Sequence, residues 1–236
     1  MFEYERTAER LTLCRPGTRW LSNGIDGGSA RAATAHNLTV PAGFDRTDLE
    51  AYVAERFEGP PAGPTLLTGV SQTHARGARY GPAEAVATAG VSNPATLPVD
   101  GTGGLDATDG VSKADRRQGD RPDPGTVNVF VGTDRALSEA GRVELLATAV
   151  EAKTATLLGT VGCTGTTSDA IAVGSAVDGA PAEFAGSATE LGNAARVCVR
   201  DAVRSALAAR YEEGPPAPTE ATHGTETAGS ASTFEP

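Results

Sequence analysis

The chain has 236 residues, 39% of them hydrophobic, and a formal net charge of −10, which suits one domain with a substantial core. The acidic balance, with no basic stripe, excludes a protein that binds nucleic acid through many phosphate contacts. No apolar run approaches the roughly 18 residues of a membrane span and the first residues lack a signal-peptide pattern, so we expect a cytoplasmic protein that does not enter a membrane.

The N-terminal part predicts strands first and then a helix. Residues 10–25 predict a strand, a turn at Pro-Gly and a second strand, and residues 34–41 predict another extended segment. Residues 45–59 predict the first helix, because Thr47 and Glu50 have capping-box spacing and a Gly-Pro-Pro sequence follows.

Two apolar segments in the middle of the chain predict core strands. Residues 64–71 and 83–92 are these segments, and residues 72–81 form a polar link between them. Residues 97–124 are rich in Gly, Asp and Arg and poor in large apolar side chains. Such a segment buries too little surface to offset its ordering entropy, so we expect a mobile surface loop.

The C-terminal half predicts strands alternating with long helices. Residues 125–133 alternate, with valines on one face, and residues 169–177 predict another strand. Residues 137–159 predict the longest helix, with Ser138 as its N-cap and Gly159 as its stop.

A last helix and a polar tail end the chain. Residues 187–214 predict the helix, with Ser187 as cap and Glu190 at capping-box spacing. We expect one domain over residues 1–211, with residues 97–124 as an inserted loop. Residues 212–236 contain glutamates but no Lys or Arg, and we expect this acidic tail to be disordered and dispensable.

The element pattern predicts an α+β fold, a single domain with a mixed β-sheet covered by helices. Strands outnumber helices, some neighbouring strands are joined by short turns, and the helices come singly or late. This order favours a mixed sheet over a doubly wound parallel one.

Several common site types are absent from the sequence. Cys14, Cys163 and Cys198 are odd in number and form no CxxC pair, so we expect free thiols rather than a disulfide framework or a structural zinc site. No Walker A, GxSxG or HExxH pattern occurs. Lysine is nearly excluded, with only Lys113 and Lys153, which is typical of a salt-adapted or high-GC source.

Three polar turns follow or precede apolar strands. They are "WLSNGIDGG" at 20–28, "VATAGVSNPAT" at 86–96 and "CTGTTSDAIAVG" at 163–174. Together they predict a polar pocket built from loop ends. For the third turn, side chains that bond only to the local backbone are an equal alternative to a ligand-binding loop.

A few polar side chains are candidates for chemistry. His74 lies in the polar link, where a hydrogen-bonded structural histidine is the alternative. Glu151 and Lys153 interrupt an alanine-rich stretch of the long helix. A solvated helix face would explain them equally well, although the rarity of lysine also suits a specific role for Lys153.

The motifs in their order resemble the adenosylcobinamide amidohydrolase family, especially its haloarchaeal members. The matching stretches include "RWLSNGIDGG" (19–28), "AVATAGVSNPATLP" (85–98), "VEAKTATL" (150–157) and "TGTTSDAIAVG" (164–174), and the resemblance covers roughly residues 10–210. It implies a hydrolase that cleaves the amide between the aminopropanol arm and the corrin propionyl side chain of adenosylcobinamide. The product, adenosylcobyric acid, re-enters cobalamin synthesis.

The resemblance implies a large, flat ligand fringed with amides, and the polar turns suit it. Short Ser, Asn, Thr and Gly turns can bond peripheral amides while glycines let the ring approach the backbone. The expected substrate-binding residues are Asn23, Asn93, Asn128, Thr164 and Thr166.

Amide hydrolysis needs a nucleophile, oxyanion stabilisation and a proton for the leaving amine. We expect His74 or Glu151 as base, with Asp169 orienting it or sharing its role. Lys153, Asn93 and Thr166 would stabilise the oxyanion, and Ser92 would hold the substrate amide or act as nucleophile. No metal and no cofactor is expected, since the corrinoid is the substrate.

Two other hypotheses remain at this stage. The chain could be a corrinoid-binding or regulatory domain without hydrolytic activity, or an unrelated Ser/Thr-rich interaction domain. Formation of a homo-oligomer is left open by the sequence.

Overall fold

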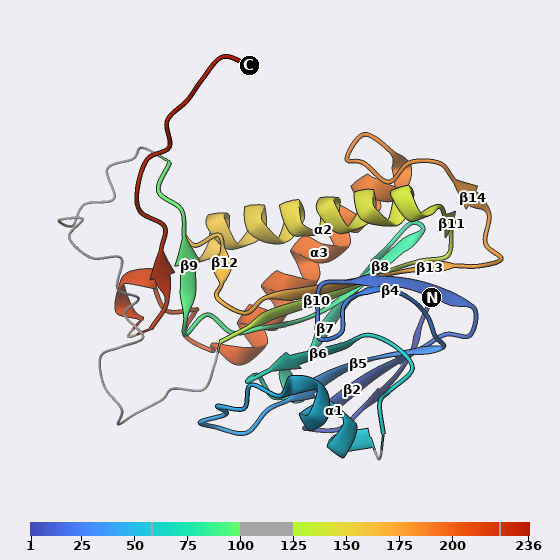
Figure 1. The fold of residues 1–236 in the computed structure, drawn as a ribbon, viewed down its shortest axis with the longest axis horizontal. Helices are drawn as coiled ribbons and strands as arrows, with labels where there is room; N and C mark the ends of the chain where they lie inside the picture. Colours follow the sequence, from blue (N-terminus) through green and yellow to red (C-terminus); the bar gives the residue numbers. More distant parts are fainter. Residues whose placement is uncertain (58, 100–124, 222) are drawn as a thin grey trace.

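The structure is a computed structural model that describes residues 1–57, 59–99, 125–221 and 223–236. Most of the loop predicted at 97–124 lies outside these residues. The described chain forms layers: two long helices, a six-stranded sheet, a four-stranded sheet and a short outer helix (Figure 1). The α+β class with mixed sheets is confirmed. Helices cover one face of the main sheet as predicted, and a second sheet, which the sequence did not indicate, covers its other face.

The six-stranded sheet is the centre of the fold. Its neighbours pair antiparallel except for one central pair, which is parallel. The strand order is β4 (Gly28–Arg31), β3 (Thr18–Ser22), β13 (Ala170–Ala176), β10 (Val127–Thr133), β8 (Ala83–Ala89) and β7 (Arg76–Tyr80). The central strands β8, β10 and β13 are buried along their whole length, because both faces of this sheet are covered.

Helices α2 (Glu139–Thr160) and α3 (Glu190–Arg210) cover one face of this sheet. As predicted, the three valines of β10 share this face, while Phe130 points to the opposite core. The alternate alanines of β8 and the alanines of α3 lie in the same core. Small side chains on both partners let the helix backbone come close to the sheet without voids.

The second sheet covers the other face. It contains β1 (Glu3–Arg6), β2 (Arg10–Cys14), β5 (Thr34–Thr39) and β6 (Thr65–Thr68), in that order. Trp20 and Phe130 are fully buried between the sheets, and the Phe2 ring stacks on Trp20 with 5.1 Å between ring centroids. Helix α1 (Leu49–Phe57) lies outside this sheet, where Phe57 contacts His36 of β5.

A buried polar network joins the two sheets. Asn37 of β5 donates to Gln72 Oε1 at 3.1 Å and to Thr88 Oγ1 of β8 at 3.0 Å, and Asn128 of β10 donates to Asn37 Oδ1 at 2.8 Å. All four side chains are almost completely buried. Buried polar groups bonded across an interface fix its register, because any slip would leave them unpaired.

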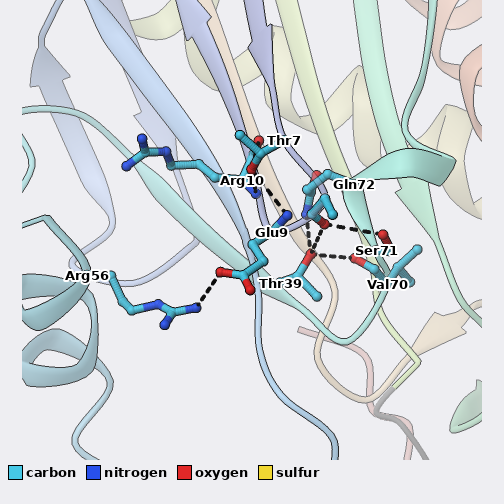
Figure 2. A network of polar contacts seen from close by, with 9 residues as sticks. Thr7, Glu9, Arg10, Thr39, Arg56, Val70, Ser71 and Gln72 are labelled. Carbon is cyan, nitrogen blue, oxygen red and sulfur yellow. Dashed lines mark hydrogen bonds and ion pairs between the residues drawn. The ribbon is translucent and has the colours of Figure 1, made fainter.

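The network continues to the loop after β6 (Figure 2). Gln72 Nε2 donates to Thr39 Oγ1 at 3.1 Å, and Thr39 Oγ1 donates to the Val70 carbonyl at 2.9 Å. Near this network, Arg56 of α1 forms an exposed ion pair with Glu9 at 3.3 Å. The loop that starts at Val70 is therefore held by buried contacts rather than by the surface pair.

Small strands complete the fold. Strands β11 (Ala136–Leu137) and β14 (Pro181–Ala182) pair with each other. A three-stranded sheet has the order β12 (Gly165–Thr166), β9 (Pro94–Thr96) and β15 (Thr225–Glu226). Two 3₁₀ turns, η1 (Gln72–His74) and η3 (Pro218–Glu220), lie in the segments before β7 and β15.

The segment 72–81, predicted as a polar link, contains regular secondary structure in the protein. It contains η1 and the edge strand β7, which pairs antiparallel with β8 around a turn at Gly81. Gly81 has a φ of 52°, in the left-handed region that suits glycine in a tight turn. Arg79 of β7 pairs with the buried Glu84 at 2.9 Å. Polar composition hid this strand because one of its faces is exposed.

Helix boundaries also differ from the prediction. Ser138 caps α2 as expected, accepting from Gly141 N at 3.0 Å. The helix continues past Gly159 and ends at Thr160, and Gly162 with a φ of 86° takes the left-handed position beyond it. Thr189, not Ser187, caps α3, and α1 begins only at Leu49.

The tail predicted as disordered contains η3 and β15. Strand β15 pairs in parallel with β9. Backbone hydrogen bonds between strands order this segment. The prediction of disorder rested on the lack of apolar side chains, and amino-acid composition does not show which backbone groups pair. The expectation of disorder is therefore corrected for Pro218–Glu220 and Thr225–Glu226.

Buried His36 predicts a pH-dependent stability. Burial, with Arg10 nearby, lowers the pKa of His36 from 6.5 to about 4. As the pH falls, the imidazole of His36 is therefore protonated in the unfolded chain before it is protonated in the folded protein. The free energy of unfolding should fall by up to about 3 kcal/mol as the pH drops from 6.5 to 4. Chemical denaturation across this range should show a smaller pH slope for His36→Gln than for the natural chain. Equal slopes in both proteins would contradict this assignment.

Candidate active site

Loops from four strands meet at one end of the six-stranded sheet. Strands β3 and β8 end there, whereas β10 and β13 begin there: Ala89 lies opposite Val127, and Asn128 beside Ala170. The three polar turns singled out in the sequence follow or precede these strand ends. The structure thus brings together the turns that the sequence predicted to form one pocket.

Asp169 is the hub of this loop cluster. Its Oδ1 accepts from Val127 N at 2.9 Å and from Thr166 Oγ1, and its Oδ2 accepts from Thr166 N at 3.0 Å and from Lys153 Nζ. The side chains of Lys153 and Asp169 are only 8% and 10% exposed. Four donors occupy the lone-pair positions of the carboxylate, which offsets the cost of burying its charge.

Local sequence makes room for this buried ion pair. Lys153 lies on the sheet-facing side of α2 among alanines and threonines. Gly165 packs directly beneath it: a Cβ at that position would lie 2.6 Å from Asp169 Oδ2 and 3.1 Å from Lys153 Nζ. A glycine is therefore required so that the backbone of β12 can approach the ion pair.

The turn after β8 closes on the loop that carries Asp169. Asn93 Nδ2 donates to Thr167 Oγ1 at 2.6 Å, and Thr167 N donates to the Asn93 carbonyl at 3.3 Å. Gly125 packs against this turn, where a Cβ would lie 2.6 Å from Ser92 Oγ. The buried Asn93 Oδ1 has no hydrogen-bond partner among the described residues. Gly125 also covers this amide oxygen, since a Cβ on Gly125 would lie 2.7 Å from it.

Thr164 lies between this loop and strand β9. Both its backbone N and its Oγ1 donate to the Ala95 carbonyl, each at 2.9 Å. Its hydroxyl proton is directed to the protein, so toward a substrate it can act only as an acceptor. The predicted residues Ser92, Asn93, Lys153, Thr164, Thr166 and Asp169 therefore lie in one cluster.

The remaining predicted residues lie elsewhere. His74 Nδ1 contacts the Ala209 carbonyl of α3 at 2.8 Å. Glu151 is 53% exposed and pairs with Arg196 of α3 at 3.0 Å, on the side of α2 away from Asp169. Asn128 is fully buried in the network between the sheets. Asn23 lies at the same sheet end as the cluster, where its Oδ1 accepts from Ile171 N at 2.7 Å.

Sequence patterns missed two members of the cluster. Thr126 and Ser168 lie with their hydroxyl oxygens 2.9 Å apart beside Asp169. Thr126 directly precedes a strand and Ser168 is one of several hydroxyls in its loop, so neither carried a distinct signal. Only the register of β10 against β13 brings them together.

The cysteines and the possible metal ligands form no site of their own among the described residues. The three cysteines are free, as predicted, and burial raises the pKa of Cys198 to about 11. Among the residues that the structure describes, no three His, Cys, Asp or Glu side chains gather where they could hold a metal ion. Nor does any described helix combine the length and apolarity needed to cross a membrane.

Comparisons with known proteins agree with the resemblance found in the sequence. The sequence model of the family described as "Adenosylcobinamide amidohydrolase" matches residues 3–215, and so ends before η3 and β15. A curated protein of Halobacterium salinarum named "Adenosylcobinamide amidohydrolase" is 45% identical over 241 residues, covering 100% of both chains.

The packing of Gly165 predicts that alanine substitutions at Gly165 and at Gly159 change the stability in opposite directions. In Gly165→Ala the new methyl group would meet a carboxylate held by four donors, so the ion pair must separate and stability should fall by about 1–3 kcal/mol. In Gly159→Ala, a substitution within α2, the added methyl group would have no atom within 4 Å. Alanine favours the helix over glycine, so the free energy of unfolding should rise by roughly 0.5–1 kcal/mol. Thermal unfolding of the two variants measures both. A Gly165→Ala protein as stable as the natural chain would disprove the close packing.

Proposed function

Because the chain belongs to the adenosylcobinamide amidohydrolase family, we propose that it hydrolyses the amide between the aminopropanol arm and the corrin propionyl side chain of adenosylcobinamide. The products are adenosylcobyric acid and aminopropanol. Release of the acid returns the corrin ring to cobalamin synthesis, so the proposed role is corrinoid salvage in the cytoplasm.

One observation carries the proposal: the buried ion pair of Lys153 and Asp169, in contact with the Thr166 hydroxyl at the end of the central sheet. A hydroxyl beside a carboxylate that is itself oriented by a third group is the arrangement of an activated nucleophile. Charges in a dry, fixed site also act more strongly on a developing oxyanion than charges in water.

In the proposed first step, Thr166 Oγ1 attacks the carbonyl carbon of the substrate amide. Its proton passes to Asp169 Oδ1, with which the hydroxyl already shares a hydrogen bond. Lys153 Nζ uses one of its three hydrogens on Asp169 and can direct another to the oxyanion. We prefer Thr166 to Ser92 as the attacking group because the Thr166 hydroxyl donates directly to a carboxylate.

The intermediate then collapses and the C–N bond breaks. The proton held by Asp169 passes to the leaving nitrogen, which departs as the amine of aminopropanol. Water attacks the resulting threonyl ester, so that its oxygen joins the acyl carbon and Thr166 regains its proton. The net change is the addition of one water across the amide bond.

Substrate binding is assigned to the polar turns at the same sheet end. Ser92 and Asn93 would hold the scissile amide or a neighbouring one. Asn23 at the end of β3 and the Thr126–Ser168 hydroxyl pair are further contacts within this cluster. The edge of a corrin carries several carboxamides, which suits a rim of amides and hydroxyls.

The activity itself is tested by incubating the protein with adenosylcobinamide at high and at low salt. Mass analysis should detect adenosylcobyric acid, with one oxygen from labelled water. Binding of the corrinoid without release of aminopropanol would instead identify a non-catalytic corrinoid-binding domain. Absence of both binding and product would reject the proposed function.

Variants separate the residues of this site from the other candidates. Thr166→Val, Lys153→Met and Asp169→Asn should each lower kcat by about a hundredfold or more, the scale of a lost acid–base or nucleophilic group. Thr166→Ser keeps a hydroxyl and should restore part of the loss. Glu151→Gln and His74→Ala should keep near-normal kcat, since neither side chain contacts Asp169. The reverse ranking would return the base to His74 or Glu151.

We also propose that the reaction needs no resident metal or cofactor, because Lys153 supplies the positive charge beside the carbonyl group. Prolonged treatment with a chelator, followed by dialysis, should leave kcat unchanged. A loss of turnover that added Zn²⁺ or Mg²⁺ restores would show metal-assisted hydrolysis instead.

A further inference from the structure

We propose that the C-terminal segment, residues 217–221 and 223–227, is a strap that positions the substrate-binding turn by completing the three-stranded sheet on which that turn is built. The term strap is used below for these residues. The inference rests on the proposed function only for its kinetic consequence, since the effect of the strap on the turn can be measured without substrate.

Strand β9 is the centre of this small sheet and directly follows the Ser92–Asn93 turn. One edge of β9 pairs with β12, where Thr166 lies opposite Pro94 and Gly165 opposite Ala95. The other edge pairs with β15, where Thr225 lies beside Ala95 and Glu226 beside Thr96. The strap is therefore one strand away from the Thr166 hydroxyl. Figure 1 shows β9 between the two flanking strands.

Backbone contacts extend this pairing at both ends. Thr227 N donates to the Thr96 carbonyl at 2.9 Å, and Thr164 N donates to the Ala95 carbonyl at 2.9 Å from the opposite edge. Pairs of strands as short as two or three residues are not stable alone in water. The order of β9, and hence of the turn before it, depends on pairing along both of its edges.

Gly224 packs closely against Pro94, the residue that follows the Ser92–Asn93 turn. Its φ of 130° lies in the region that favours glycine. A Cβ on Gly224 would lie 2.4 Å from the Pro94 carbonyl oxygen and 3.1 Å from Pro94 Cδ. Pro94 directly follows Asn93, so the strap backbone packs on the residue that ends the substrate-binding turn.

The contacts of the strap contribute little free energy compared with the stability of the whole domain. Among the described residues, only a few backbone hydrogen bonds hold the strap, and the side chains of β15 are exposed. Release of the strap should therefore be a local event, well below global unfolding. Its expected consequence is a less ordered turn, with weaker substrate binding and little change in thermal stability.

The chain offers a matched pair of variants for the test. Gly224 and Gly229 both have positive φ, 130° and 107°, so an alanine strains the backbone at each. Only at Gly224 would the added methyl group meet other atoms, because a Cβ on Gly229 has nothing within 4 Å. Gly224→Ala should detach the strap, whereas Gly229→Ala serves as the control.

Hydrogen exchange without substrate provides the first measurement. In Gly224→Ala, exchange should become faster in residues 223–227 and also in the segments around 93–96 and 163–167. In Gly229→Ala, both segments should keep their natural protection. If the strap exchanges faster while 93–96 and 163–167 stay protected, the proposal is overturned. If Gly224→Ala leaves the strap protected, a chain ending at residue 216 provides the same comparison with the strap removed.

Kinetics with adenosylcobinamide provide the second measurement. Detachment of the strap should raise KM by about tenfold, equivalent to about 1.4 kcal/mol of binding free energy, and should change kcat much less. A purely structural contribution would lower the amount of folded protein without changing KM. An unchanged KM in a variant whose strap is detached would overturn the positioning role. If the natural chain shows no turnover, the proposed function fails while the exchange data still decide whether the strap orders the turn.

Discussion

The arrangement of the loops at the candidate active site depends on the carboxylate of Asp169. It accepts hydrogen bonds from the first residue of β10, from the backbone and side chain of β12, and from Lys153 of α2. In sequence, Val127 lies 42 residues and Lys153 16 residues from Asp169, whereas Thr166 is only 3 residues away. A buried charge is tolerated only where it is fully paired, so the carboxylate and its donors must assemble together. The same contacts that satisfy the charge therefore fix the relative positions of the loops.

Glycines allow these loops to come close enough. At Gly165 and Gly125, an added Cβ would reach the ion pair and the Ser92–Asn93 turn, respectively. At Gly224, it would reach the Pro94 backbone. Each glycine lies on a different loop, and each packs against polar groups of the cluster. The candidate site is thus built by backbone packing against short polar side chains.

The two sheets give this cluster a rigid support. The network of Asn37, Gln72, Thr88 and Asn128 holds the second sheet in register against the main one, directly beneath the strand ends that carry the loops. On the opposite face, alanines let α3 pack closely and α2 carries Lys153 to the sheet end. Loops on such a support can have functional geometry without large hydrophobic anchors of their own.

The sequence alone determined the fold class, most strands and helices, and the family, because hydrophobic periodicity and ordered motifs are local properties of the chain. It also singled out Ser92, Asn93, Lys153, Thr164, Thr166 and Asp169 as candidates, since hydroxyls, an amide and a rare lysine stand out against an alanine-rich background. Tertiary structure decided which candidates meet. His74 bonds to α3, Glu151 faces Arg196, and Asn128 is buried between sheets, because strand register and helix rotation, which no local pattern encodes, set where each side chain points. Tertiary structure likewise decided that β7 and β15 are strands: both are exposed edges held by backbone hydrogen bonds, β7 to the neighbouring strand β8 and β15 to β9, which is distant in sequence.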